Sequence, residues 1–307
     1  MSIASRTRIG ISSPHIFPDG AVDMALVRRY AARAEELGYA SLWTQERVTG
    51  TPVVLDPIPF LSYLAGQTTK ARIGVSVLVL ARHNVVHLAK HLASLDQMSG
   101  GRLIVGLGLG ANAADLATYG VPPERRVLRF NESIAALRSL WTESPARFAG
   151  ELISVKGANI EPKPAQRPLP IWFGANAEAA VERAVRHGNG WTGAGSSLRE
   201  VFPQRLALAK RLRQEAGKSK ENFPLSKRVY LALDENESRA RERLTDWFGY
   251  YYGNRELMDK VAVYGAPARV QEQLEAWSEA GVDEFILNPV YDQEQHLERL
   301  AKLTGLV

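Results

Sequence analysis

The sequence predicts an α/β protein built as a (β/α)8 barrel, the TIM-barrel architecture. Its 307 residues contain eight short apolar stretches that alternate with segments of helical periodicity. Each stretch is apolar along most of its length, as expected of parallel strands buried on both faces. Eight such units with insertions match the length of one barrel domain, which we expect to span residues 1–307. An open, doubly wound sheet is the alternative fold.

The first half of the chain predicts four strand–helix units. Strands are expected at 8–12, 40–44, 72–80 and 103–107. Apolar residues at spacings of three and four predict helices at 23–37, 58–69, 85–98 and 127–141. Gly38 follows the first helix, where a C-cap glycine belongs.

The second half continues the alternation after a break. Residues 145–169 end in a Pro-rich run and predict an extended excursion. Strands are expected at 171–174, 190–192, 229–233 and 284–287, with helices at 177–187, 199–214, 237–248, 267–280 and 292–303. Insertions are therefore expected after the fourth, sixth and seventh strands, and loops 145–169 and 193–226 are expected to line the pocket.

Composition excludes several classes of protein. The chain has no cysteine, which rules out disulfides, thiolate metal ligands and cysteine nucleophiles. No apolar run approaches the roughly 20 residues that span a bilayer, and the polar Met1–Arg8 is unlike a signal peptide, so we expect a cytoplasmic protein without a membrane partner. The basic run Lys210–Lys220 has helical spacing and no interleaved aromatics, which favours a solvated helix face over a nucleic-acid site.

The segment Asp96–Gly110 contains a glycine-rich strand end. Gly106, Gly108 and Gly110 leave room either for a flat or anionic ligand or simply for packing, and the residues favour neither alternative. Gly106, Gly108 and Ala111 also satisfy the dinucleotide fingerprint. That fingerprint belongs on the first strand of its unit, whereas three predicted strands precede this one, so a nicotinamide site is the weaker interpretation.

In a barrel, the carboxyl ends of the strands form one mouth that holds the site. The segments expected there are Ser13–His15, Gln45–Arg47, Ser76–His83, Gly108–Asn112, Gly174–Asn176 and Trp191–Gly195.

Several motifs in this order resemble the bacterial luciferase-like monooxygenases, a family of flavin- and deazaflavin-dependent oxidoreductases. The resemblance covers nearly the whole chain. It rests on E-E-L-G-Y-A-S-L-W (35–43), A-R-I-G-V-S-V-L-V-L (71–80), L-A-K-H-L-A-S-L-D-Q-M-S-G-G-R-L-I-V-G-L-G-L-G (88–110), Y-G-V-P-P-E-R-R (119–126), P-I-W-F-G-A-N (170–176), G-N-G-W (188–191) and G-A-P-A-R-V-Q-E-Q-L (265–274) followed by A-G-V-D-E (280–284).

The resemblance implies that a flavin-type ring lies across the barrel mouth. Ser76 and Val77 match the position of a non-prolyl cis peptide in many members, and Gly108, Leu109 and Gly110 match a segment that flanks the ring. Gly174, Ala175, Asn176 and Trp191 match the region that binds the cofactor, with Ala175 and Asn176 before a helix N-terminus that suits a phosphate.

The chain departs from the family after the second strand. Many members carry a carboxylate followed by histidine, whereas this chain has Glu46 and Arg47. Arg47 is a permanent cation that cannot act as a base near neutral pH. Glu46 is expected to orient the ring or substrate, with a structural ion pair to Arg47 as the alternative.

Histidines supply the other candidate catalytic groups. We expect His15, on the first loop, as general acid or base, with a plain loop histidine as an equal alternative. We expect His83, at a strand-to-helix corner, in contact with the ring or substrate. His83, His87 and His91 lie four residues apart, but no carboxylate joins them at ligand spacing, so no metal is expected.

The expected function is a flavin-type oxidoreductase that acts on a small organic substrate with coenzyme F420 or reduced FMN. The sequence of residues 71–126 is most similar to deazaflavin-dependent members of the family, which favours coenzyme F420. A flavin reductase partner is implied only if the cofactor is FMN. A homodimer is expected. The alternatives are a noncatalytic flavin-binding barrel and a nicotinamide-dependent dehydrogenase.

Overall fold

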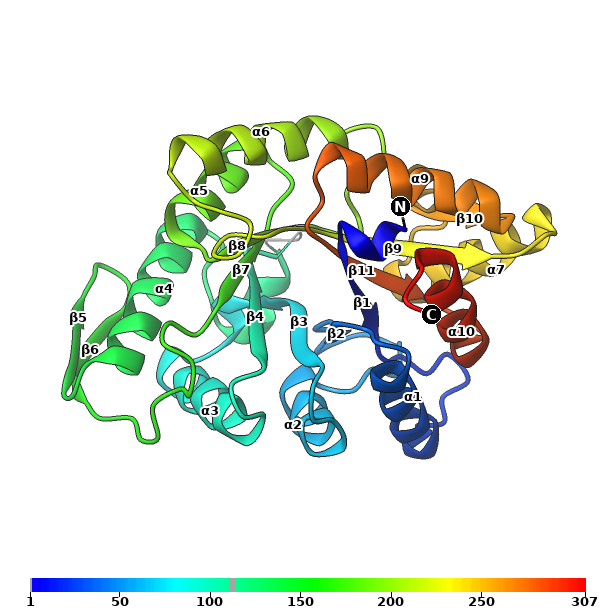
Figure 1. Cartoon of the computed structure of the whole chain (residues 1–307). Coiled ribbons are helices and arrows are strands. Elements are labelled where there is room, and N and C mark those ends of the chain that lie inside the picture. The colour runs from blue at the N-terminus through cyan, green and yellow to red at the C-terminus, as the bar shows by residue number, and fades with distance from the viewer. Residues whose placement is uncertain (1, 111–113) are drawn as a thin grey trace.

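The computed structural model describes residues 2–110 and 114–307, and it contains a closed barrel of eight parallel strands (Figure 1). Around the ring the strands are β1 (Arg8–Ser12), β2 (Ser41–Thr44), β3 (Arg72–Val79), β4 (Leu103–Gly108), β7 (Ile171–Gly174), β8 (Gly190–Gly193), β9 (Leu225–Leu233) and β11 (Glu284–Pro289). Strand β8 pairs with β9, and β11 pairs with β1, which closes the ring. The barrel prediction is confirmed and the open sheet is wrong.

Helices surround the barrel where the apolar spacing predicts them (Figure 1). They are α1 (Met24–Glu36), α2 (Pro57–Gln67), α3 (Val85–Met98), α4 (Arg126–Thr142), α5 (Glu178–His187), α6 (Phe202–Glu215), α7 (Glu237–Tyr252), α9 (Pro267–Ala280) and α10 (Gln293–Thr304). Side-chain caps explain several starts: the Asn84 amide oxygen accepts hydrogen bonds from the amides of Val86 and His87, and Asp23 accepts one from Leu26. Gly38 adopts φ +84° after α1, as expected of a C-cap.

Four short elements lie outside these eight units. Strands β5 (Ala146–Ala149) and β6 (Ser154–Ala158) form an antiparallel hairpin, and α8 (Leu257–Val261) with β10 (Val263–Gly265) follows α7. Strand β10 pairs with the last residues of β9. Three 3-10 turns complete the fold: η1 (Ile3–Ser5), η2 (Leu80–Arg82) and η3 (Ala114–Tyr119).

The excursion 145–169 does not lie where we expected it. The hairpin packs against α4, and Gln166 binds the Asp96 carboxylate and the carbonyl of Leu103, the first residue of β4. This position is at the amino ends of the strands, because the segment follows a helix rather than a strand. The prediction that 145–169 lines the pocket is therefore wrong.

Large side chains fill the barrel interior below the mouth. Trp43, Ile104, Trp172 and Ile286 form a separate buried cluster there. Glycines make room for the two indoles: a Cβ on Gly74 would lie 2.5 Å from Trp43, and one on Gly190 would lie 2.5 Å from Trp172. The larger core lies between the strands and the helices. The lower barrel is thus packed solid, and the site is restricted to the carboxyl ends.

None of the helices in residues 2–110 and 114–307 is long and apolar enough to cross a bilayer.

Candidate functional site

The carboxyl ends of the eight strands gather the predicted site segments around one mouth. The Ser76–Val77 peptide at the end of β3 is cis, as the family resemblance implies. Ala111 and Asn112, which the fingerprint and the mouth prediction include, lie outside the described residues.

The Val77 side chain occupies the space that side chains at nearby glycine positions would need. A Cβ on Gly108 would lie 2.7 Å from Val77 Cγ2, and one on Gly174 would lie 2.7 Å from Val77 Cγ1. A Cβ on Gly106 would lie 2.0 Å from the carbonyl oxygen of Val75. These glycines thus make room for β3, which supports the packing alternative at these positions. Gly110 adopts φ +79°, and Leu109 packs partly buried against the core.

Glu46 and His83 form one polar cluster beside the mouth. The buried Glu46 carboxylate lies 2.6 Å from His83 Nε2 and accepts hydrogen bonds from the Val79 amide and from Arg82. Both carboxylate oxygens are therefore engaged. This geometry ties the end of β2 to the η2 corner that follows β3.

Arg47 is not the ion-pair partner of Glu46. It donates a hydrogen bond to the Tyr251 carbonyl, and its guanidinium lies 5.1 Å from the centre of the Tyr251 ring. The alternative of a Glu46–Arg47 ion pair is therefore wrong, because residue 47 turns toward α7.

His15 is buried in a neutral form. Its Nδ1 lies 2.7 Å from the Ser13 carbonyl oxygen, so Nδ1 carries the proton and Nε2 is an acceptor. Burial lowers the pKa of His15 to about 3, with a smaller effect from the positive charge of Arg228. Near neutral pH the imidazole is therefore neutral, its Nδ1 proton is bound to the Ser13 carbonyl, and its Nε2 is the atom free to accept.

Polar side chains from β9 also enter the mouth. Arg228 donates hydrogen bonds to the Ser76 carbonyl at 2.7 Å and to Ser12 Oγ at 3.3 Å. The Tyr230 hydroxyl donates to Gln45 at 3.1 Å and lies 2.8 Å from the hydroxyl of Tyr252. The prediction missed Arg228 because it began this strand at 229, where continuous apolar character starts. Ser226, Lys227 and Arg228 are three consecutive polar residues with no strand periodicity, so the sequence alone gives no signal that the strand begins at Leu225.

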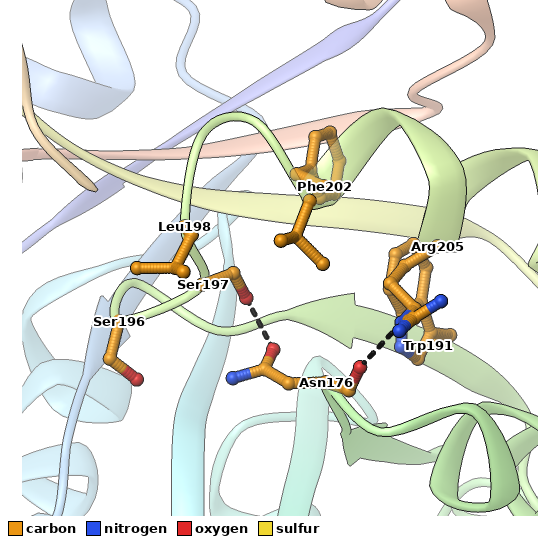
Figure 2. Close-up of a pocket in the computed structure, with 8 residues that line it drawn as sticks. Asn176, Trp191, Ser196, Ser197, Leu198, Phe202 and Arg205 are labelled. Atoms are coloured by element: carbon orange, nitrogen blue, oxygen red, sulfur yellow. Dashed lines mark hydrogen bonds between the residues drawn. The ribbon is translucent and has the colours of Figure 1, made fainter. Parts of the chain in front are cut away.

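A cavity of about 210 Å³ opens between the ends of β7 and β8 (Figure 2). Asn176 and Trp191 line it, as the resemblance implies, together with Ser197 and Arg205. The Asn176 side-chain oxygen accepts a hydrogen bond from Ser197, and its carbonyl accepts one from Arg205 at 3.0 Å. Trp191 donates to the Ala175 carbonyl at 2.9 Å and stacks on Phe202. The cavity therefore combines a flat apolar wall with a cation beside the start of α5.

The three predicted helix-face histidines do not converge. His87 and His91 are exposed on α3 with ring centres 6.4 Å apart, while His83 turns to Glu46. Within residues 2–110 and 114–307, no three histidine, aspartate or glutamate side chains are placed to hold a metal ion.

Several buried polar atoms on β9, on β11 and on the loop after β1 have no hydrogen-bond partner in the part of the chain that the structure describes. They are Ser13 Oγ, His15 Nε2, Arg228 Nε and Asn288 Nδ2. Buried polar groups are almost always paired, so unpaired ones indicate a missing partner. This set offers donors and one fixed acceptor, which fits the carbonyl and N–H edges of a flavin-type ring.

Comparison with known proteins identifies the family of this chain. The sequence profile of the luciferase-like monooxygenases matches residues 7–306. A protein of Amycolatopsis mediterranei named F420-dependent glucose-6-phosphate dehydrogenase is 27% identical, over 89% of this chain and 91% of its own.

Two solved structures share the fold. One is an F420-dependent secondary alcohol dehydrogenase with an F420-acetone adduct, with a TM-score of 0.83, 19% identity, and coverage of 98% of this chain and 99% of its own. The other is the oxygenating component of a Pseudomonas putida diketocamphane monooxygenase with FMN, with a TM-score of 0.73, 16% identity and 98% coverage of both chains. Because its profile spans nearly the whole sequence, this chain belongs to the luciferase-like monooxygenase family.

Proposed function

We propose that this chain is a coenzyme F420-dependent oxidoreductase of a small organic substrate. The observation that carries the proposal is the set of unpaired buried polar atoms at the mouth, at Ser13, His15, Arg228 and Asn288. A curated relative that matches most of both chains is named for the same coenzyme, which supports the deazaflavin over FMN. When bound, this coenzyme accepts or donates a hydride.

The residues at the mouth would hold the ring. Ser76, Val77, Gly108, Leu109 and Gly110 would flank it, since they lie toward the carboxyl ends of the neighbouring strands β3 and β4. The apolar Val77 side chain lies against Gly108 and Gly174 and would present a flat, dry surface. Such a surface excludes water from the reacting atoms, which is the task of the protein in a cofactor enzyme.

The cavity at Asn176 would hold the phosphate-bearing tail. Gly174, Ala175 and Asn176 precede α5, and α5 has no side-chain cap on its first turn. Uncapped amides at a helix N-terminus bind anions, and the Arg205 guanidinium lies beside Asn176, where its ion pair with Glu178 on the first turn of α5 offsets part of its charge. Trp191 and Phe202 would supply the apolar wall of the same cavity.

The histidines take different roles. His15 Nε2 is a buried acceptor, so it would receive a hydrogen bond from a substrate hydroxyl or a ring N–H. His83 would be a positioning residue, because Glu46 holds it at the η2 corner that follows Ser76 and Val77. Glu46 would act through His83 and Val79, since its carboxylate is enclosed.

The remaining features of the proposal come from the family resemblance. The chain would act as one barrel domain over 1–307, as a homodimer in the cytoplasm. Reduced FMN is the alternative ring, and it would require a flavin reductase as a partner.

Anaerobic titration of the purified protein tests the proposal. Coenzyme F420 should bind with a change in ring absorbance and fluorescence, and turnover with an organic substrate should consume no oxygen. Tight binding of reduced FMN with oxygen consumption would instead support the FMN alternative. Binding without turnover on any substrate would indicate a noncatalytic flavin-binding barrel, and binding of neither ring would overturn the proposal.

A further inference from the structure

Arg228 is a buried cation that has no ionic partner among residues 2–110 and 114–307. Its side chain is 2% exposed and faces the barrel interior, where it donates to the Ser76 carbonyl and to Ser12 Oγ. Its Nε has no partner. Arg228 forms no salt bridge with any carboxylate in the part of the chain that the structure describes.

Such a charge is costly to bury. Removing an ion from water costs several kcal/mol even after relaxation, and neutral dipoles offset only part of that. The Tyr230 ring, whose centre lies 5.6 Å from the guanidinium, adds a modest cation–π contribution. The site therefore favours a ligand that brings negative charge near Arg228.

The guanidinium of Arg228 lies beneath the mouth of the barrel. Around the ring, β9 and β3 are separated by β11, β1 and β2 on one side and by β8, β7 and β4 on the other. The Arg228 side chain therefore crosses the barrel between opposite strands and ends at Ser76, the first residue of the Ser76–Val77 peptide. The positive charge of Arg228 also contributes to the lowered pKa of His15, which supports the position of Arg228 beneath the mouth.

We infer that Arg228 stabilises the negative charge that a flavin-type ring gains on reduction, so that the site binds the reduced coenzyme more tightly than the oxidised one. This inference rests on the proposed function, which places the ring beside Ser76. A hydride carries two electrons and one proton, so the ring that receives it gains one negative charge and the substrate that loses it is oxidised by two electrons. Arg228 is the charged group already held beneath that position.

The experiment compares the dissociation constants of oxidised and reduced coenzyme F420, measured anaerobically by absorbance and fluorescence. Arg228→Met should weaken binding of the reduced form about tenfold more than binding of the oxidised form, since an opposite charge at short range shifts an ionisation by about one pH unit or more. For a two-electron couple, a tenfold difference is about 30 mV in the midpoint potential of the bound coenzyme. Arg228→Lys should retain most of the preference.

Arg72→Met is the matched control. Arg72 begins β3, at the other end of the barrel, and its guanidinium lies 5.8 Å from the centre of the Trp172 ring. The control should leave the ratio of the two dissociation constants unchanged. Equal weakening of both forms by Arg228→Met would show a purely structural role and overturn the inference, while the proposed function would stand. Failure of the wild-type protein to bind either form would overturn both.

Discussion

His83 Nε2 lies 2.6 Å from Oε1 of Glu46, so the loop after β3 supplies an imidazole to the carboxylate that follows β2. Residue 47, directly after this carboxylate, is an arginine that donates to the Tyr251 carbonyl. The imidazole that pairs with Glu46 therefore comes from a different loop of the barrel.

Glu46→Gln should lower the free energy of unfolding by about 2–3 kcal/mol. The buried carboxylate accepts hydrogen bonds from Val79 and Arg82, and bonds to a charged acceptor are the stronger ones. Urea denaturation at pH 7 measures the change. Glu151→Gln is the control: its pair with Arg125 is exposed, so its loss should cost less than about 1 kcal/mol. Similar costs for the two variants would contradict the buried role of Glu46.

His15 should make the protein less stable as the pH falls from 6.5 toward 3. The unfolded chain binds a proton near the ordinary pKa of 6.5, whereas burial keeps the folded imidazole neutral down to about 3. Stability therefore rises with pH in this window, by up to about 1.4 kcal/mol per pH unit from this group.

Denaturation of the wild type and of His15→Gln between pH 4 and 8 measures this contribution. The variant should show a smaller slope below pH 6.5, and the two curves should run parallel above pH 7. Burial also lowers the pKa of His296, but His296 contributes the same pH dependence of stability to the wild type and to the variant. Identical slopes at low pH would contradict a neutral buried His15.

Gly108→Ala should cost about 1–3 kcal/mol of stability, because the new Cβ would lie 2.7 Å from Val77 Cγ2. Shortening the neighbour with Val77→Ala should recover part of the loss, with a coupling of about 1 kcal/mol in a double-mutant cycle. Thermal denaturation of the four proteins provides the cycle. Gly66→Ala is the control: Gly66 lies in α2 with no atom within 4 Å of the new Cβ, so this variant should gain stability. Additive effects at 77 and 108 would disprove the packing explanation.

Lys227→Met should stabilise the protein most at or below pH 7. Burial between Phe202 and Trp277 lowers the pKa of Lys227 to about 7, while the unfolded lysine keeps its proton up to about 10.5. Wild-type stability therefore rises between pH 7 and 10.5, and the variant lacks this rise. The difference in unfolding free energy between the variant and the wild type should shrink by about 1.4 kcal/mol per pH unit over that range. A difference independent of pH would contradict the lowered pKa.

Part of the site could be predicted from the sequence. Glu46 and His83 were both candidates, but their contact was not predicted, because they belong to different strand–helix units. Asn176 and Trp191, from the neighbouring strand ends of β7 and β8, do line one cavity, and Trp191 donates to the Ala175 carbonyl. Arg228 was not predicted because the first part of β9 is polar, and strands of this barrel were predicted from continuous apolar stretches.

Local chemistry in the sequence determined the eight strands and their helices, as α3 shows: Asn84 caps its start, and both of its ends match the predicted 85–98. Contacts between distant segments were decided only by tertiary structure. Arg228 meets the Ser76 carbonyl across 152 positions, and Val77 fills the space left by Gly108 and Gly174. The physical reason is that caps and periodicity act within a few residues, whereas closing the barrel sets which side chains share its interior.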